Sequence, residues 1–440
     1  MDKDKIEKAK NKTKDVLNTI GKGYSRAGNA FLDFFDKHVL LICMILITIL
    51  SLVARYLTVQ YPTNDIAGIV FSWMRKIKEV GFSKFYTVEN DYTPLYLFFI
   101  AVLCQLPTGE TITNLGMTYY ANWMIYLKSF FFFLDLLSAF GIYLLIRALG
   151  KDKTKAAIGF MVYMILPVQY VNTAIWGQCD NMYTVCFIYI LYFLVKHKDG
   201  WAWFLVGLGF ATKLQGVFIF PLMVYLVFSR RVKFYKIYLA FVGLIVTFLP
   251  EYFCGAPFGL PFEFISTQLG RFSGLTLGCG NMWHLMNFSS GALEMVSNAA
   301  TWIGLGLIGV FMAILFVLKI DLKGENLLYV GTFLIAIVPF FLPHMHERYF
   351  YALDVLVVVY ALVKGKRYFL IPLMQVSSGI AYYHYLSGKY FIQSWGEDSV
   401  HISAYINLAV LCVIFYDLLK LKGTAVKADE PQPQQIASVK

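Results

Sequence analysis

The amino-acid sequence predicts an all-α polytopic membrane protein with about twelve transmembrane helices. Hydrophobic residues make up 58% of the 440 residues and charged residues only 15%, whereas soluble domains are about one quarter charged. Apolar runs of spanning length recur along the chain, and most Lys and Arg residues gather between alternate runs. Positive charge on one side is typical of membrane proteins, so the net charge of +11 does not require a nucleic-acid partner. This composition excludes a soluble globule, a disordered chain and a fibrous protein.

The chain begins with a basic arm, residues 1–38, ahead of the first apolar run at 39–58. The arm is too long and too polar for the n-region of a signal peptide, and no small-residue cleavage pattern follows. We therefore expect an amphipathic arm in the cytoplasm and a retained first span. One transmembrane domain should cover 39–420, and 421–440 should form a disordered cytoplasmic tail.

Two apolar runs need a decision before the spans can be counted. The run 94–106 has only about 13 residues, too few to cross a bilayer, so it is treated as non-crossing. The run 201–228 is too long for one upright helix and carries Lys213 near its middle. We expect two short helices with Lys213 at their outer turn, because a single span would put Arg230 and Arg231 outside. The other expected spans are 123–147, 157–172, 181–196, 234–250, 299–319, 326–342, 349–363, 368–386 and 401–420.

This topology leaves both termini inside and two long outer loops, 60–122 and 251–298. In the first loop, apolar residues recur at helical spacing over 66–80, which predicts an amphipathic helix lying in the membrane interface. Asp65 directly precedes that helix and can be its N-cap, although Thr63 and Asn64 could cap equally well and a cap can also face a cavity. Asp91, in DYTPLY, is either a turn residue or a second site carboxylate.

A short polar turn, WGQCDN at 176–181, separates two further spans on the outer side. Trp176 can be an ordinary interfacial aromatic residue. Gln178, Asp180 and Asn181 are either a solvated connector or part of a polar site.

The segment PHMHERYFY, 343–351, is the densest polar cluster beside a predicted span. His344, Glu347 and Arg348 have the spacing of one helix face. At a helix N-terminus such a face favours phosphate, because free N–H groups and the helix dipole attract anions. His344 and His346 beside Glu347 could instead hold a metal, but the ligand set is incomplete. An interfacial girdle of aromatic and charged residues is the third possibility.

Arg55, near the outer end of the first span, and Lys213 add two cations at a similar depth. Either could be a side chain that merely snorkels to the interface. Taken together, the outer segments supply the groups needed to deprotonate an acceptor and stabilise a phosphate leaving group: the carboxylates Asp65, Asp91 and Asp180, and the cations Arg55, Lys213 and Arg348.

Five sequence features, spread over most of the chain, resemble a known family: Asp65 ahead of W-x-x-x-I and Gly81-Phe82, DYTPLY at 91–96, WGQCD at 176–180, Lys213, and H-x-H-E-R at 344–348. The pattern resembles bacterial glycosyltransferases of the C-type (GT-C) fold, which use polyprenyl-phosphate sugars. It is most similar to those grouped with the second mannosyltransferase of GPI-anchor synthesis, and also to the dolichyl-phosphate-glucose glucosyltransferases. Thr93 departs from the second proline expected in D-Y-P-P-L, which changes turn stiffness rather than chemistry.

The resemblance implies an inverting transfer of a hexose, mannose before glucose, to a glycan, glycolipid or protein acceptor at the outer face of the cell membrane. Asp65 would be the catalytic base, with Asp91, Asp180 and Gln178 on the acceptor side. The donor phosphate would be bound by Arg348, His346, His344, Lys213 and Arg55, with Glu347, Trp176 and Tyr92 in support. No cofactor is expected, although Asp65 with Asp180 or Glu347 could bind a divalent ion.

Two other classes remain open on the sequence alone. A transporter or flippase of a lipid-linked sugar would place ionisable groups near mid-membrane. Lys128, Asp135 and Lys213 are the candidates for such groups inside the apolar runs, and so small a number favours the transferase. A non-catalytic subunit of envelope assembly would give no reason for the polar clusters. Cys254 and Cys279 share an outer loop and could form a disulfide in an oxidising compartment.

Overall fold

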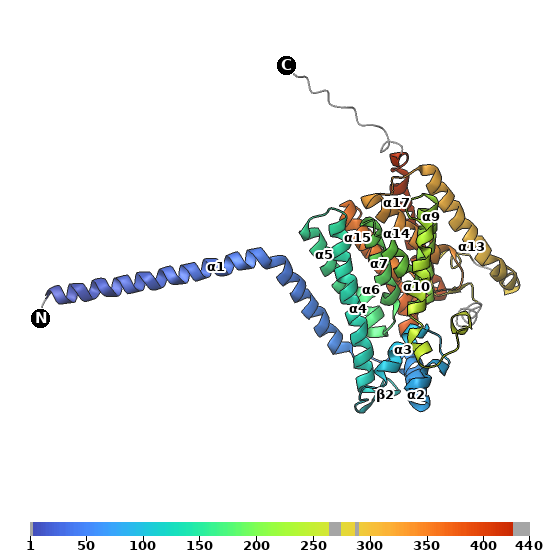
Figure 1. Cartoon of the computed structure of the whole chain (residues 1–440), viewed down its shortest axis with the longest axis horizontal. Helices are drawn as coiled ribbons and strands as arrows, with labels where there is room; N and C mark the ends of the chain where they lie inside the picture. Colours follow the sequence, from blue (N-terminus) through green and yellow to red (C-terminus); the bar gives the residue numbers. More distant parts are fainter. Residues whose placement is uncertain (1–2, 264–273, 287–289, 426–440) are drawn as a thin grey trace, which may run out of the picture.

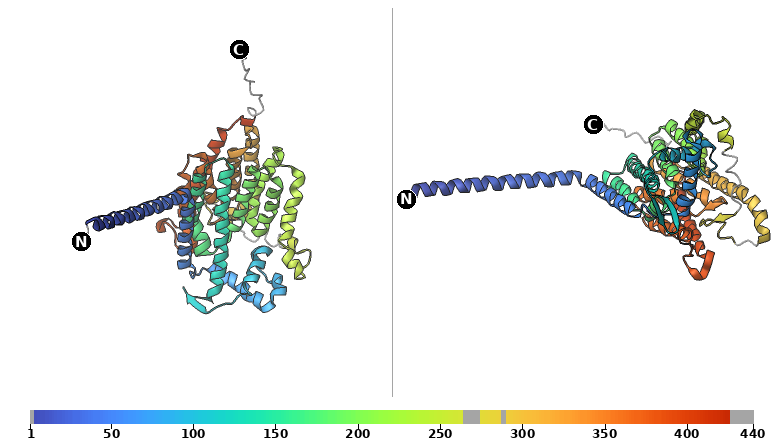
Figure 2. Two further views of the ribbon diagram at one scale, coloured as in Figure 1. Left: turned by 60° about the vertical axis from the view of Figure 1, so that its left-hand side comes forward. Right: turned by 90° about the horizontal axis from the view of Figure 1, so that it is seen from below.

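A computed structural model describes the chain except for residues 1–2, 264–273, 287–289 and 426–440, so most of the expected C-terminal tail lies outside the described residues. The molecule is a body of roughly aligned helices from which one long helix, α1 (Lys3–Thr58), extends far to one side (Figure 1). The expected basic arm and the first expected span are thus one bent helix. The arm runs across the direction of the body helices, and the residues toward Thr58 pack along the body (Figure 2).

Every expected span coincides with helical structure. The long elements of the body are α4 (Ala121–Ala148), α5 (Lys153–Ile165), α7 (Asp180–Val195), α8 (Asp199–Thr212), α9 (Phe220–Phe228), α10 (Tyr238–Val246), α13 (Ser290–Leu318), α14 (Gly324–Phe341), α15 (Tyr351–Lys364), α16 (Leu370–Ser387) and α17 (Ser399–Leu419). Short helical turns join some of them: α6 (Pro167–Tyr170), η3 (Val171–Trp176), η4 (Leu214–Ile219), η5 (Phe234–Ile237), α11 (Leu249–Phe253) and η6 (Gln393–Asp398).

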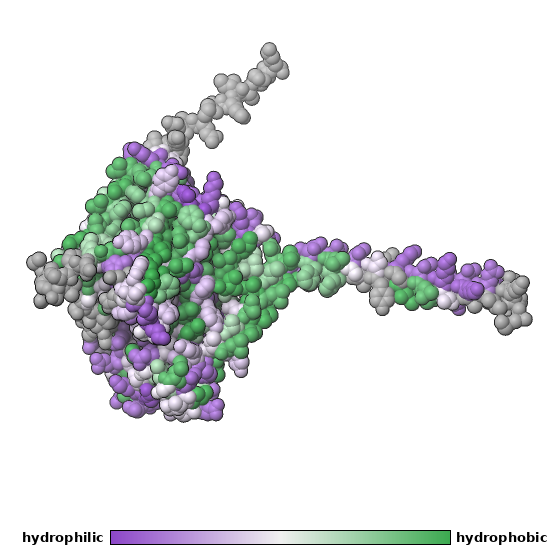
Figure 3. Space-filling view, turned by 180° about the vertical axis from the view of Figure 1, so that it is seen from behind, coloured by the Kyte–Doolittle hydropathy of each residue, from purple (hydrophilic) through white to green (hydrophobic). Residues whose placement is uncertain are grey.

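The expected number of twelve spans is not confirmed. Among the described residues, five helices are long and apolar enough to cross a membrane, or six if α5 and residues 167–176 form one span bent by 47° at Pro167. Helices α8 and α15 have only 14 residues each, which is about 21 Å of helix against a hydrocarbon layer of about 30 Å. The surface nevertheless fits a membrane protein, because apolar residues dominate the middle of the body and hydrophilic residues its lower end (Figure 3).

Residues 60–120, the first expected outer loop, fold into a cap on one end of the body, at the bottom of Figure 1. The helix expected over 66–80 is present as the π-helix η1 (Asn64–Val70) and α2 (Phe71–Val80). Its apolar face is buried against the start of α4, through Ile66, Phe71 and Ile77. The cap also contains η2 (Phe82–Thr87), α3 (Pro94–Leu103) and a hairpin of β1 (Thr111–Asn114) and β2 (Met117–Tyr120), which the sequence analysis did not expect.

The basic connections gather at the opposite end of the body, as expected for the two basic loops. Lys151 forms an ion pair with Glu325 at 2.5 Å. Arg231 donates to the carbonyl oxygens of Leu194 and Leu322. These contacts join connections far apart in sequence, so one end of the bundle carries the cap and the other carries the basic loops.

The second expected outer loop, 251–298, is shorter than predicted because α13 already begins at Ser290. Within it, β3 (Thr276–Leu277) pairs with β4 (Met345–His346) in a parallel ladder. Cys254 and Cys279 are both free thiols, so the disulfide considered above is absent.

Candidate active site

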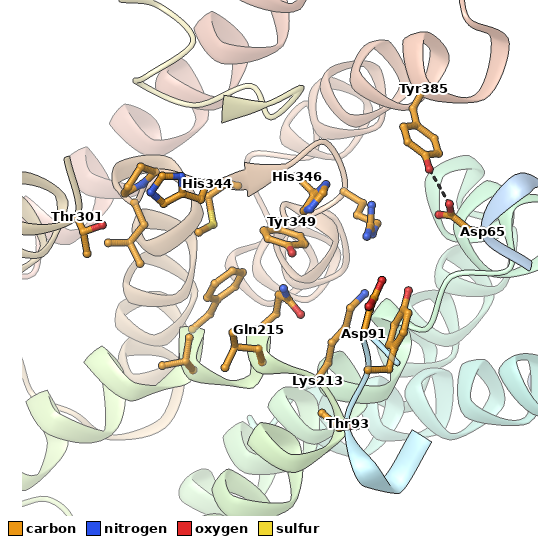
Figure 4. Close-up of a pocket in the computed structure, with 18 of the residues that line it drawn as sticks. Asp65, Asp91, Thr93, Lys213, Gln215, Thr301, His344, His346, Tyr349 and Tyr385 are labelled. Atoms are coloured by element: carbon orange, nitrogen blue, oxygen red, sulfur yellow. Dashed lines mark hydrogen bonds between the residues drawn. The ribbon is translucent and has the colours of Figure 1, made fainter. Parts of the chain in front are cut away.

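A cavity of about 610 Å³ lies where the cap meets the body, a size typical of ligand sites. Its wall comes from segments far apart in sequence: the cap, the break between α8 and η4, the segment 342–349, α13 and α16 (Figure 4). The predicted site residues on this wall are Asp65, Asp91, Tyr92, Lys213, His344, His346 and Arg348.

Asp65 is the carboxylate at one end of this cavity (Figure 4). Its Oδ2 accepts hydrogen bonds from Trp176 Nε1, at 2.9 Å, and from Gln178 Nε2. Its Oδ1 accepts one from the Tyr385 hydroxyl at 2.6 Å. Thr63 occupies the N-cap position of η1, so the N-cap interpretation of Asp65 is wrong. All three hydrogen-bond donors are neutral, and the described residues provide no ion pair to this carboxylate.

The turn after η3 brings Gln178 to Asp65 because residue 177 is glycine. Gly177 has a φ of +77°, a left-handed conformation that other residues rarely adopt. A Cβ atom there would lie 1.7 Å from Ile66 Cδ1. The missing side chain therefore lets η1 pack directly onto the turn that supplies two of the three donors.

Lys213 and Arg348 are two cations on the wall, and both contact Asp180. Lys213 has an extended backbone between α8 and η4, at the break that the sequence analysis predicted. Its Nζ lies 2.5 Å from Asp180 Oδ1, and Arg348 Nε lies 3.7 Å from Asp180 Oδ2. Asp180 is completely buried behind them. It therefore positions the cations instead of facing the cavity as an acceptor-side carboxylate.

Glu347 supports Arg348 from the side. The Arg348 Nη1 atom lies 2.5 Å from Glu347 Oε1, and His346 Nδ1 lies 3.6 Å from Glu347 Oε2. Burial opposes ionisation of Glu347, but Arg348 and His346 hold its pKa below the ordinary value. Burial likewise opposes the charge on Arg348, yet Glu347 and Asp180 raise its pKa well above the ordinary value. The guanidinium group therefore stays charged inside the protein.

The expectation that 344–348 form a helix N-terminus is wrong. Met345 and His346 lie in β4, and α15 begins only at Tyr351. Leu342 is extended and His344 has a φ of +61°, which ends α14 and turns the chain toward β3. The polar cluster thus reaches the cavity from a strand and a turn, so a helix dipole does not contribute and Arg348 itself supplies the charge.

Gln178 and Trp176 lie behind the wall and act through Asp65. Tyr92, which lines the cavity, donates from its hydroxyl to Gln178 Oε1 at 3.1 Å. Burial raises the pKa of Tyr92 well above its ordinary value, so it remains a neutral donor. Asp91 lies on the wall near Lys213 (Figure 4), and His344 Nδ1 lies 2.7 Å from the Gly274 carbonyl oxygen.

Arg55 is the predicted site residue that the structure does not bring to the cavity. It is 6% exposed and pairs with Asp135 Oδ2 at 2.9 Å inside the helical body. It also donates to Thr173 Oγ1 at 3.0 Å. Its charge is therefore committed to Asp135, and it is not a candidate for contacting a donor phosphate.

The far part of the same cavity is mostly apolar. It extends past Lys213 along η4 and past the end of α14 toward Thr301 of α13 (Figure 4). The apolar lining residues are Ile69, Leu214, Val217, Phe218, Leu342, Pro343 and Met345. One cavity thus joins a polar end with a carboxylate and cations to an apolar end next to the helical body.

Tyr385 is the site residue that the sequence analysis missed. It comes from the last turn of α16, beyond every recognised motif. Its ring stacks on Trp176 with 4.7 Å between centroids. No local pattern marks it, because its role depends on where the end of α16 brings it, next to Asp65 and Trp176.

The described residues contain no group of three or more His, Cys, Asp and Glu side chains arranged to hold a metal ion. The arrangement that is present consists of a carboxylate with neutral partners and two cations fixed by buried carboxylates. Such a site can take a proton from a hydroxyl group at one point and stabilise an anion at another.

Comparison with protein families supports a membrane enzyme. The family model of the dolichyl-phosphate-mannose-protein mannosyltransferases matches residues 107–253, about a third of the chain. No curated protein matches the sequence. The matched segment contains Trp176, Gln178, Asp180 and Lys213, whereas Asp65 and Arg348 lie outside it. The similarity supports a membrane glycosyltransferase of the GT-C type.

Proposed function

We propose that this protein transfers a hexose, mannose in preference to glucose, from a polyprenyl-phosphate carrier to an acceptor hydroxyl at the outer face of the membrane. The observation that carries the proposal is that one cavity holds two fixed cations, an apolar extension and a carboxylate to which no described residue is a counter-ion. These features match the acceptor hydroxyl, the phosphate and the lipid of such a reaction, respectively.

The chemistry is a single displacement with inversion. Asp65 accepts the proton of the acceptor hydroxyl as its oxygen forms a bond to the anomeric carbon. The bond from that carbon to the phosphate oxygen breaks, and the electron pair stays on the phosphate. A phosphate monoester is already a good leaving group, so the transfer needs a base and positive charge but no general acid.

Arg348 and Lys213 are the groups that stabilise the charge developing on the leaving phosphate. Their buried partners, Asp180 and Glu347, fix their positions before the donor binds. A preorganised cation does not have to reorganise as charge develops, which is why such groups lower the barrier. His346 and His344 line the same wall and add hydrogen-bonding capacity.

The polyprenyl chain would follow the apolar part of the cavity along η4 and α13. This placement keeps the lipid beside the helical body while the sugar lies near Asp65. It explains why the polar residues cluster at the cap end and not in the middle of the helices. Lys128 and Asp135, two ionisable groups inside apolar runs, bind neighbouring residues and do not line this cavity.

The proposal is tested with purified protein in detergent and a panel of polyprenyl-phosphate sugars, mannose and glucose first, with glycan, glycolipid and peptide acceptors. Wild type and Asp65→Asn are compared with and without chelator. We expect transfer or donor hydrolysis by wild type only, unchanged by chelation. Loss of activity on chelation would favour a metal-dependent transferase.

If folded wild-type protein neither transfers nor hydrolyses any of the donors, the proposal is contradicted. Transport of a lipid-linked sugar across proteoliposomes, with no transfer, would then favour the transporter hypothesis. Full activity of Asp65→Asn would remove Asp65 from the chemistry even if transfer itself is confirmed.

A further inference from the structure

We infer that the Tyr385 side chain acts as a plug: its hydroxyl group occupies one oxygen of Asp65, the proposed base, and keeps water from that oxygen. An acceptor hydroxyl would displace the tyrosine hydroxyl when it binds. This inference rests on the proposed function and goes beyond it, because it assigns a role to the final third of the chain. Tyr385 would act as a positioning residue that controls which hydroxyl reaches the carboxylate.

The two oxygens of Asp65 are occupied in different ways. Oδ2 is held by Trp176 and Gln178, which are both buried and lie behind the wall of the cavity. Among the described residues, Oδ1 is held only by Tyr385, through a hydrogen bond of 2.6 Å. Oδ1 is therefore the oxygen that an incoming acceptor can reach, and the tyrosine hydroxyl occupies the position that the acceptor hydroxyl needs.

Tyr385 can leave this position more readily than the two buried donors, Trp176 and Gln178. Its side chain is 45% exposed, and it lies on the last turn of α16, which ends at Gly388 in a left-handed conformation. The ring lies against Trp176, so rotation of the tyrosine gives up one hydrogen bond and one stacking contact. By contrast, removal of Trp176 or Gln178 would leave buried groups without partners.

The chemical need for such a plug follows from the donor. Water can replace the acceptor in the same displacement: Asp65 would take a proton from water, the water oxygen would bond to the anomeric carbon, and the phosphate would leave. A base open to solvent would thus hydrolyse the donor whenever no acceptor is bound. The phenol hydroxyl blocks that reaction because it occupies Oδ1, the oxygen that would otherwise take the proton from water.

The decisive variant is Tyr385→Phe, which keeps the ring on Trp176 and removes only the hydroxyl. Tyr383→Phe is the matched control, since Tyr383 is equally exposed, lies two residues away on α16 and does not line the cavity. We expect Tyr385→Phe to raise the ratio of donor hydrolysis to transfer about tenfold, the effect of one hydrogen bond to a charged group. Tyr383→Phe should leave this ratio unchanged.

A second measurement needs no donor. A water-soluble carbodiimide modifies accessible carboxylates, and mass spectrometry of the peptide containing Asp65 follows the modification over time. We expect the carbodiimide to label Asp65 faster in Tyr385→Phe than in wild type or Tyr383→Phe. Equal labelling in all three proteins would overturn the inference, and so would an unchanged ratio of hydrolysis to transfer. Faster labelling in a protein that turns over no donor would support the plug while refuting the proposed transfer, so the two failures are distinguishable.

Discussion

Asp65 and Asp135 are held in similar ways but lie in different surroundings. Each carboxylate accepts hydrogen bonds from three neutral side chains, which are Trp176, Gln178 and Tyr385 for Asp65, and Tyr163, Thr173 and Asn181 for Asp135. Asp135 is also paired with Arg55 at 2.9 Å and is completely buried. Asp65 has no such counter-ion among the described residues and lines a cavity.

The difference between Asp65 and Asp135 shows that the contacts that orient a carboxylate do not decide whether it can react. Neutral donors orient both groups, but a buried counter-ion commits Asp135 to holding α1, α4 and η3 together. A carboxylate that is oriented yet unpaired can still accept a proton from a ligand. A polar residue in an apolar helix is thus not functional by itself, and access to a cavity is the distinguishing feature.

The largest expected effect is on catalysis by Asp65→Asn. The amide keeps the shape of the side chain but cannot act as a base, so we expect transfer to fall about a thousandfold, or about 4 kcal/mol in the barrier. Donor affinity and the thermal unfolding midpoint should stay near those of wild type. Steady-state kinetics, binding of the donor and a thermal melt check the three parts separately. A variant that binds donor weakly but turns over normally would contradict the assignment.

Asp135→Asn should have the opposite profile. It leaves Arg55 buried without a counter-ion, which costs about 3 kcal/mol of stability, while the folded fraction stays active. The measurement is thermal unfolding in detergent, with activity normalised to folded protein. The double variant Arg55→Leu with Asp135→Leu is the control, because removal of both charges should recover most of the stability. Loss of transfer in stable Asp135→Asn protein would erase the contrast between the two sites.

Much of the fold could be predicted from the sequence. A helix in an apolar environment needs a run of apolar residues of a certain length, and such runs can be read directly from the chain. The helices, the helix over 66–80 and the break at Lys213 all follow from local pattern. The hairpin β1–β2 and the strand β4 do not, because both depend on pairing partners. His344 and Arg348 have helical spacing, yet the ladder with β3 overrides it.

The candidate site could be predicted where a charged residue lies beside an apolar run, because a charge is energetically unfavourable near the membrane interior. Lys213, Asp180 and Arg348 are charged groups beside apolar runs, and the structure brings them together. Arg55 has the same local signature and lies elsewhere, because its partner Asp135 comes from another helix. Tyr385 is unremarkable in a chain with 30 tyrosines. Its contacts with Asp65 and Trp176, which come from distant parts of the chain, assign it a role.

A third carboxylate, Glu251, extends the comparison to a group that receives neither a cation nor a hydrogen-bond donor from the described residues. It is fully buried in α11, and neither of its carboxylate oxygens has a hydrogen-bond partner within the described parts of the chain. Burial raises its pKa from 4.5 to about 7. At a pH between 4.5 and 7, Glu251 has already released its proton in the unfolded chain but still holds it in the folded protein. Stability should therefore fall as pH rises from about 4.5 through 7.

Glu251→Gln removes this titration and leaves the shape of the side chain unchanged. At pH 8 we expect the variant to be more stable than wild type by about 3 kcal/mol, and at pH 4.5 by almost nothing. Thermal melts at the two pH values measure the difference. An equal shift at both pH values would show that the effect comes from packing and not from charge.

The smallest expected effect tests whether the geometry of Arg348 matters as well as its charge. Arg348 spans two buried carboxylates, Glu347 and Asp180, and Lys has a single ammonium group that cannot reach both. We expect Arg348→Lys to weaken binding of a polyprenyl phosphate about tenfold, or about 1.4 kcal/mol. Binding to the immobilised variant measures this change, and the exposed Arg147→Lys at the other end of the body is the control.

The outcome of that exchange decides between two interpretations of the H-x-H-E-R segment. If the forked guanidinium group of Arg348 is needed to place positive charge beside the leaving phosphate, Arg348→Lys must lose affinity for the polyprenyl phosphate while Arg147→Lys does not. Equal affinity in both variants would mean that Arg348 is held by Glu347 and Asp180 for structural reasons alone, as Arg55 is held by Asp135. The segment would then be an interfacial girdle, and Lys213 would be left as the cation that faces the donor.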